Sequence, residues 1–291
     1  MQAVKLHFPL ARSAGNLYLA QRAFPHSKTW VGQAQNQVAL EIKDDSLLGL
    51  AFSYDFNDKE LPKVAESLKQ LESADFSMCT FSSGVLSGLA ESKLVELRLD
   101  FAAISGKDLE VIGKIQSLET IWLTGASVRD EQLLLIKDLP SLTSLTLKST
   151  SLTSHALANL CKGFESLKRL HLPASIDDSG PAYLSEGRSR INELDLSYSK
   201  ISNCCAPHLA QLGLETLYLN DTEIGDDALS ELSQSKTLKV LFLNGTLITD
   251  KGLNHLENLT TLEHLELRDT RITEIGAARL RSKLKDCAVF S

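Results

Sequence analysis

One leucine frame recurs along most of the chain at a nearly constant spacing. Its clearest copy reads Leu-x-x-Leu-x-Leu at residues 262–267, and the copy before it occupies residues 238–243. The central position of the frame recurs at offsets of 23 to 25 residues, at Leu50, Ala74, Leu97, Ile121, Leu145, Leu170, Leu194, Leu217, Leu241 and Leu265. Such a period restricts the chain to a repeat architecture, in which each unit buries its apolar face against its neighbours.

Each part of the unit LxxLxLxxTxITDxxLxxLxxL predicts a local structure. The Leu-x-Leu alternation predicts a short strand with two side chains in the core and the middle one exposed. A small or hydroxyl residue follows at a turn, where we expect the hydroxyls to satisfy backbone groups: Cys79, Ala102, Ala126, Thr150, Ser175, Ser199, Thr222, Thr246 and Thr270. A step such as Thr249-Asp250 then predicts a helix start, and Leu253 and Leu256 share one face of that helix.

These residues resemble the leucine-rich repeat family, in particular the TxITDxGLxxL variety that is common in bacterial proteins. The resemblance covers Leu47 to about Phe290. It implies an α/β fold, a right-handed horseshoe solenoid of about ten repeats of 23–25 residues, with a parallel sheet on the concave face and helices outside.

The ends of the chain depart from the period, and we expect three regions. Residues 1–46 form a small β-rich cap, because residues 16–21 and 38–42 alternate as strands do. Residues 47–283 form the solenoid, and residues 284–291 form a C-terminal capping strand. In that last segment Leu284-x-x-Cys287-x-Val289 imitates the frame, which predicts a truncated eleventh strand with Cys287 in the core.

Composition excludes several classes of protein. An apolar content of 43% with only 6% aromatics indicates a largely aliphatic core and excludes disorder, and no apolar run reaches the roughly 18 to 20 residues of a membrane span. A net charge of −7 argues against a nucleic-acid binder. The first residues lack the apolar block of a secretory signal, and five cysteines show no zinc-binding spacing. We expect a cytoplasmic protein with reduced thiols.

The sequence contains no phosphate loop, nucleophile elbow, H-E-x-x-H or dinucleotide motif. The groups that come nearest to a reactive site have structural interpretations: a turn for Ser82-Ser83-Gly84, turns or helix starts for Asp177-Asp178 and Asp226-Asp227, and outer helices for His155, His208 and His255. We therefore expect no enzyme, no metal and no cofactor.

The middle residue of each strand faces the concave surface, which turns the sequence into a map of a binding face. Exposed aromatics are typical of interface anchors, and the alternative is that they stack across strands and only add stability. One patch combines Tyr218 and Phe242 with Tyr198 and Val240, a second combines Trp122 with Phe101 and Arg98, and Lys148, Arg169 and His171 form a small positive island between them. Asp195 and Glu266 complete the predicted partner-binding residues.

The mapped face carries four basic and eight acidic side chains, a net charge of −4. This balance disfavours nucleic acid and membranes and mildly favours a partner with basic stretches. Ten strands at about 4.8 Å give a groove of roughly 45 Å, which suits a protein or an extended peptide. We expect a non-catalytic adaptor or scaffold. The alternatives are a structural subunit permanently integrated in a larger assembly, and an effector or ubiquitin-ligase-type substrate-recognition module. Partner identity, pathway and oligomeric state stay open.

Overall fold

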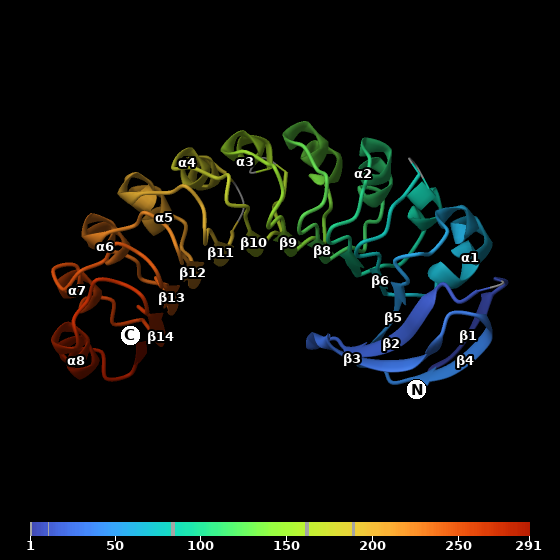
Figure 1. Ribbon diagram of the computed structural model, residues 1–291, viewed down its shortest axis with the longest axis horizontal. Helices are drawn as coiled ribbons and strands as arrows, with labels where there is room; N and C mark the ends of the chain where they lie inside the picture. The colour runs from blue at the N-terminus through green and yellow to red at the C-terminus, as the bar shows by residue number, and fades with distance from the viewer. Residues whose placement is uncertain (1, 11, 83–84, 161–162, 188–189) are drawn as a thin grey trace. The chain divides into compact units, whose positions relative to one another are not determined.

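The computed structural model describes residues 2–10, 12–82, 85–160, 163–187 and 190–291 (Figure 1). Ser83 and Gly84 of the predicted Ser/Gly turn, and Cys161, lie outside the described residues. The chain forms two compact units, unit 1 (Met1–Leu145) and unit 2 (Thr146–Ser291).

The sheet of unit 1 begins with antiparallel strands and continues with parallel ones. The strands of unit 1 are β1 (Gln2–Phe8), β2 (Gly15–Gln21), β3 (Phe24–Gln33), β4 (Asn36–Ile42), β5 (Ser46–Phe52), β6 (Ser73–Asp75), β7 (Glu96–Arg98) and β8 (Thr120–Trp122), with β9 (Ser144–Thr146) at the boundary. β2 pairs antiparallel with both β3 and β5, whereas β5, β6, β7 and β8 pair in parallel. β1 and β4 form a separate antiparallel pair. Strands β2 and β4 confirm the two strands predicted before the repeats, while β1 and β3 were not predicted.

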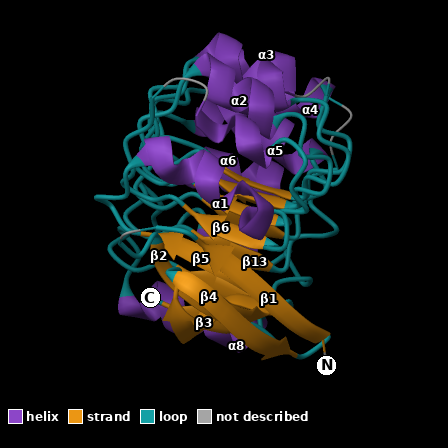
Figure 2. Ribbon diagram, turned by 90° about the vertical axis from the view of Figure 1, so that its right-hand side faces the viewer, coloured by secondary structure: helices purple, strands orange, loops and turns teal. Residues whose placement is uncertain are grey.

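Short helices connect the repeat strands of unit 1. They are η1 (Asp58–Glu60), α1 (Leu61–Leu68), η2 (Val85–Leu89), α2 (Gly106–Ile112) and η3 (Asp130–Ile136). The helix α1 packs against β1, and the cap strands β1 to β4 lie together at the front of Figure 2. The cap therefore extends the sheet of unit 1 through β2 and packs against its helical layer through β1.

Unit 2 repeats one strand-and-helix pattern throughout. Its strands are β10 (Arg169–His171), β11 (Glu193–Asp195), β12 (Thr216–Tyr218), β13 (Val240–Phe242), β14 (His264–Glu266) and β15 (Ala288–Phe290), and its helices are α3 (Ser154–Leu160), α4 (Ser179–Glu186), η4 (Asn203–Cys205), α5 (Ala206–Gln211), α6 (Asp226–Leu232), α7 (Leu253–Leu256) and α8 (Glu274–Lys283). All neighbouring strands from β10 to β15 are parallel, and the predicted central leucines lie opposite one another, Leu217 beside Leu241 and Leu241 beside Leu265. These leucines are buried, so the leucine frame is the core.

The hydroxyl residues at the turns satisfy backbone carbonyls, as the sequence predicts. Thr150, Ser199, Thr222, Thr246 and Thr270 each donate a hydrogen bond of 2.5 to 2.7 Å to the carbonyl oxygen three residues earlier. Ser175 departs from this pattern and donates to the carbonyl of Leu152 in the preceding repeat. The threonine or serine of the frame is thus a local cap on the end of each strand.

The prediction for the last repeat was wrong by two residues. Val289, and not Cys287, lies opposite Leu265 in the pairing of β14 with β15. The reason is that α8 runs to Lys283 and Leu284 still donates its N–H to Leu280, so Leu284 packs as the end of a helix and not as the start of a strand. Cys287 is consequently half-buried outside the core.

A residue in the left-handed conformation follows most of the repeat strands. Positive φ values of 54° to 67° occur at Met78, Phe101, Ser149, Tyr198, Asp221 and Asp269, and at Gly125 and Gly245. This conformation costs a residue with a Cβ atom roughly 1–2 kcal/mol. At Gly125 an added Cβ would also lie 2.4 Å from the ring of Phe101, so that ring would have to move.

Candidate partner-binding surface

The open face of the unit 2 sheet, opposite the helices, carries a continuous row of rings. This aromatic row consists of His171, Tyr218, Phe242, His264 and Phe290. The rings of Tyr218 and Phe242 stack with centroids 4.6 Å apart and an interplanar angle of 14°. His264 continues the row, 5.2 Å from Phe242 and 5.1 Å from Phe290.

Both interpretations of the predicted patch have support from this geometry. Tyr218 and Phe242 are opposite residues of β12 and β13, so they do stack across strands. Both side chains nevertheless stay partly exposed, because each ring covers only a face of its neighbour. Burial, followed by the charges of Glu193 and Asp195, raises the pKa of Tyr218 above its ordinary value. The tyrosine therefore offers a neutral hydroxyl and an apolar ring edge.

The rest of the predicted patch lies on or beside the same strands. Tyr198 occupies the left-handed turn after β11 and is 66% exposed. Val240 is half-buried in β13, between Thr216 and His264 of the neighbouring strands. Unit 2 therefore brings apolar side chains from several consecutive repeats onto one face.

The predicted positive island is largely neutralised by its own sheet. Lys148 Nζ lies 2.8 Å from Asp195 Oδ1, and His171 Nε2 lies 2.9 Å from Glu193 Oε1. Arg169 is exposed in β10. The charges of Lys148 and Asp195 thus offset each other, so this part of the face attracts partners less strongly than its residue types indicate.

Glu266 is also engaged within the sheet. It accepts a hydrogen bond of 2.8 Å from Asn244 Nδ2, and His264 and Arg268 lie 3.2 and 3.7 Å from its carboxylate. The hydrogen bond from Asn244, with help from His264 and Arg268, holds the pKa of Glu266 below its ordinary value. This carboxylate helps to order the end of the aromatic row.

The second predicted patch lies in unit 1. The guanidinium of Arg98 stacks 4.4 Å above the ring of Trp122, and its Nη1 lies 3.4 Å from Asp100. Phe101 is 57% exposed and its ring lies against Gly125. Arg98 and Trp122 are therefore brought together as predicted, whereas Phe101 lies on the turn that follows β7.

The sequence interpretation missed the contribution of the cap to the open face of unit 1. The ring of Tyr18 crosses Gly49, its hydroxyl lies 2.7 Å from Ser73 Oγ, and Ser73 donates to Glu96 at 3.0 Å. Burial raises the pKa values of Tyr18 and Glu96. The signal that indicates this contact is Gly49 itself, a glycine at a flanking strand position.

The cap also places a cation on this face. Lys28 Nζ lies 2.8 Å from Asp75 and 4.4 Å above the ring of Tyr18. Burial alone would raise the pKa of Asp75, but the hydrogen bonds from Lys28 and Ser77 hold it below its ordinary value. The hairpin of β2 and β3 is thus fixed to the first repeats by charge as well as by strand pairing.

Another missed feature is an amide ladder along the ends of the strands. Asn220 Oδ1 accepts from the N–H of Asn244 at 3.0 Å, and Asn244 Oδ1 accepts from the N–H of Arg268 at 2.8 Å. In unit 1, Asp100 accepts from Thr124 in the same way at 2.9 Å. The recurrence of Asn or Asp at one frame position signals this ladder, and it commits those side chains to the fold.

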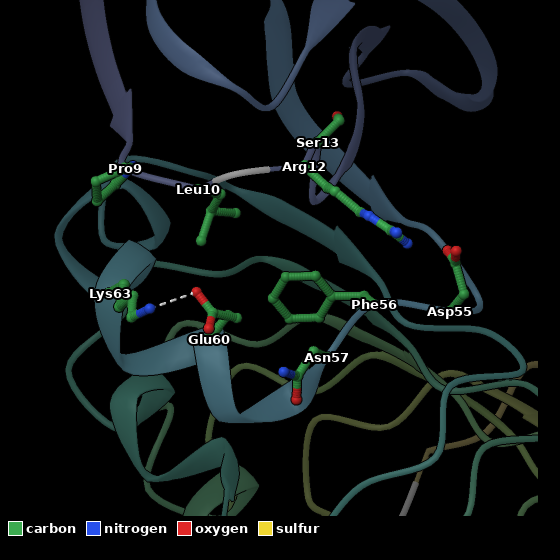
Figure 3. A pocket seen from close by; sticks show the side chains of 9 residues that line it. All are labelled: Pro9, Leu10, Arg12, Ser13, Asp55, Phe56, Asn57, Glu60 and Lys63. Carbon is green, nitrogen blue, oxygen red and sulfur yellow. Dashed lines mark hydrogen bonds and ion pairs between the residues drawn. The ribbon is translucent and has the colours of Figure 1, made fainter.

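A cavity of about 560 Å³ lies in unit 1, beside the cap (Figure 3). Its lining consists of Pro9, Leu10, Arg12, Ser13, Asp55, Phe56, Asn57, Glu60 and Lys63. Lys63 pairs with Glu60 at 2.7 Å, and Arg12 points toward the Asp55 side of the cavity around the ring of Phe56. The mixture of a ring, aliphatic carbons and both charges suits an amphipathic group such as a peptide side chain.

In the part of the chain that the structure describes, no three or more His, Cys, Asp or Glu side chains gather to hold a metal ion, and no helix is long and apolar enough to cross a bilayer. His155, His208 and His255 lie on α3, α5 and α7 as predicted. Ser82, the described part of the predicted Ser/Gly turn, donates its N–H to the carboxylate of Asp58.

In-register parallel strands, a leucine core and connecting helices at a constant period define a leucine-rich repeat fold. The fold is similar to an internalin (inlF) from Listeria monocytogenes, with a TM-score of 0.55 and 23% identity over 78% of this chain. The chain spans 62% of the length of that internalin. At this identity the similarity concerns the fold alone.

Two further solved structures are less similar. An internalin C2 (inlC2) from Listeria monocytogenes has a TM-score of 0.48 and 24% identity over 72% of this chain and 83% of its own. The plant peptide hormone receptor RGFR1, in complex with RGF2, has a TM-score of 0.45 and 19% identity over 78% of this chain and 41% of its own. No protein-family model and no curated protein matches the sequence.

Proposed function

We propose that this chain is a non-catalytic adaptor or scaffold that binds another protein, or an extended peptide, on the open face of unit 2. The observation that carries the proposal is the aromatic row, whose rings keep partly exposed edges. The core is already filled by the buried leucines and does not require these rings. Aromatic side chains in such positions anchor many interfaces, and losing one anchor costs 2 kcal/mol or more of binding free energy. Tyr198 and Val240 extend the apolar area around the row.

The charges on the face support a partner held mainly by apolar contacts. Lys148 and His171 already have carboxylate partners, so an incoming chain gains little from pairing with them. The six strands β10 to β15 span roughly 24 Å at about 4.8 Å spacing, which is the length of a short extended peptide. A partner that lays alternating apolar side chains along the ring edges fits this surface.

We also propose that the protein acts in the cytoplasm. The cysteines Cys79, Cys204, Cys205 and Cys287 are free thiols. Burial raises the pKa of Cys79 to about 11 and that of Cys205 to about 12, so both stay protonated at neutral pH. Unpaired, protonated thiols suit a reducing compartment.

The test is affinity purification from the native organism followed by mass spectrometry. The bait is the wild-type chain or the double variant Tyr218→Ala/Phe242→Ala, and the control is His155→Ala on α3, away from the sheet. We expect a partner that the wild type and the control retain and the double variant loses, while all three baits melt cooperatively. Retention of every partner by the double variant contradicts the proposal. An obligate oligomer of the isolated chain in light scattering favours the permanently assembled subunit instead.

A further inference from the structure

Three exposed apolar side chains follow consecutive strands of unit 1. Tyr54, Met78 and Phe101 are 78%, 65% and 57% exposed, and they occupy the same turn position in successive repeats. We call these three residues the turn ridge. The backbone N–H of Met78 donates to the carbonyl oxygen of Asp100 at 2.8 Å, and that of Phe101 donates to the carbonyl oxygen of Thr124 at 2.6 Å, so these two turns are tied to the next repeat. The ridge is therefore held at the spacing of the strands.

Folding does not account for the bulky residues at these positions. Met78 and Phe101 have φ values of 63° and 57°, a conformation that favours glycine, asparagine and aspartate. Among the equivalent turns of unit 2, Asp221, Gly245 and Asp269 follow that preference, whereas Ser149 and Tyr198 do not. In unit 1 the backbone instead carries large apolar groups that it disfavours and that stay in solvent. Exposed apolar groups of this kind mark an interaction surface.

Charge beside the ridge selects the kind of partner. Asp55 follows Tyr54, with Arg12 pointing toward it from across the cavity, and Asp100 precedes Phe101 and lies 3.4 Å from Arg98. Residues 1–145 carry 14 basic and 18 acidic side chains, a net charge of −4. This net negative charge attracts basic segments and repels acidic segments and anionic lipid.

We propose that the turn ridge binds a segment of a partner protein that carries apolar side chains flanked by lysine or arginine. The apolar side chains pack on Tyr54, Met78 and Phe101. The cavity that begins at Asp55 and Phe56 adjoins the ridge and accepts one further side chain. This surface is separate from the aromatic row, because all of its residues belong to unit 1.

The test uses a fluorescently labelled synthetic peptide with leucines on one side and lysines beside them, titrated with the full chain by fluorescence polarisation. In the double variant Met78→Asn/Phe101→Asn the turns keep a residue that suits their backbone while the ridge loses its apolar surface. We expect this variant to bind the peptide at least about tenfold more weakly than wild type, with an equal or higher melting temperature. The control Ile275→Asn removes an exposed apolar side chain from α8 in unit 2, outside both proposed surfaces, and leaves peptide binding unchanged.

Several outcomes overturn the proposal. These outcomes are equal binding of the lysine peptide and a glutamate analogue by wild type, binding of neither peptide, and equal peptide binding by wild type and the ridge variant. If wild type self-associates in light scattering and Phe101→Asn is monomeric, the ridge binds a second copy of the chain. If vesicles containing phosphatidylserine bind in a ridge-dependent way, the ridge binds lipid. The variant Tyr218→Ala/Phe242→Ala retains peptide binding if the ridge is the site. Failure of the two proposals is thereby distinguishable.

Discussion

The rings of Tyr218 and Phe242 stack nearly parallel, 4.6 Å apart, on the open face of unit 2. The same pair therefore stabilises neighbouring strands and presents an apolar surface. These two roles are separable by experiment, because stacking couples the residues to each other and binding couples them to a partner.

A double-mutant cycle measures the stacking contribution. We expect Tyr218→Ala and Phe242→Ala to be coupled by about 0.5–1.5 kcal/mol in the free energy of urea unfolding. The coupling is expected because either single change removes the whole stack. The pair Tyr218 and Val240, on the same two strands but without a ring contact, is the control cycle. Additivity of the two alanine changes would show that the rings contribute only independently.

Gly49 is required by the position of Tyr18. An added Cβ would lie 2.3 Å from Tyr18 Cζ, so Gly49→Ala has to displace the ring and its hydrogen bond to Ser73. We expect a loss of about 1–3 kcal/mol in the free energy of unfolding. Gly32→Ala in β3 is the matched control, since its Cβ would meet only Val38 at 3.9 Å. Equal stability of the two variants in urea unfolding would contradict this account.

Glu96 makes stability depend on pH. Burial raises its pKa above the ordinary 4.5, so between 4.5 and the folded value the native state binds more protons than the unfolded state. Stability from this group is therefore present below 4.5 and is lost as pH rises through the folded pKa. We expect Glu96→Gln to be more stable than wild type at pH 7, with a difference that shrinks below pH 4.5. A pH series of unfolding curves tests this, with the exposed Glu110→Gln as control.

Asp226 joins two repeats through the start of a helix. Its carboxylate accepts hydrogen bonds from the N–H and the Oγ1 of Thr249, at 2.8 and 2.6 Å. Asp226→Ala leaves both donors without this charged acceptor, and we expect a loss of about 1.5–3 kcal/mol. Asp227→Ala changes the next residue of the same helical turn and controls for the helix dipole. If thermal unfolding of the two variants is the same, the bridge to Thr249 adds nothing.

The repeating part of the fold was predictable because one physical requirement recurs at every unit. Leu217, Leu241 and Leu265 are buried where the frame places them, and Thr222 and Thr246 cap the strand ends as expected. The last repeat was misplaced because Leu284, the residue that caps the end of α8, and a nearby cysteine imitate the frame. Periodicity identifies the frame only where several units agree.

The proposed binding face was predictable only in part. Alternation correctly places Trp122, Tyr218 and Phe242 on the sheet surface, and register explains their neighbours. The alternation of side chains does not predict that Lys148 pairs with Asp195, because that contact joins strands two repeats apart. It also misses Lys28 and Tyr18, which reach the face from an antiparallel hairpin outside the period.

The hydrogen bond between Tyr18 and Ser73 joins groups 55 residues apart, more than twice the separation between neighbouring repeats. Closing so long a loop carries a larger entropic cost, and chains rich in distant contacts fold more slowly. Among the described hydrogen bonds and ion pairs of unit 2, that between Lys148 and Asp195 reaches two repeats and the others reach no further than the next repeat. We therefore expect unit 2, with its lower contact order, to gain amide protection first in pulsed hydrogen exchange. We expect the cap of unit 1 to form in the slowest phase of refolding.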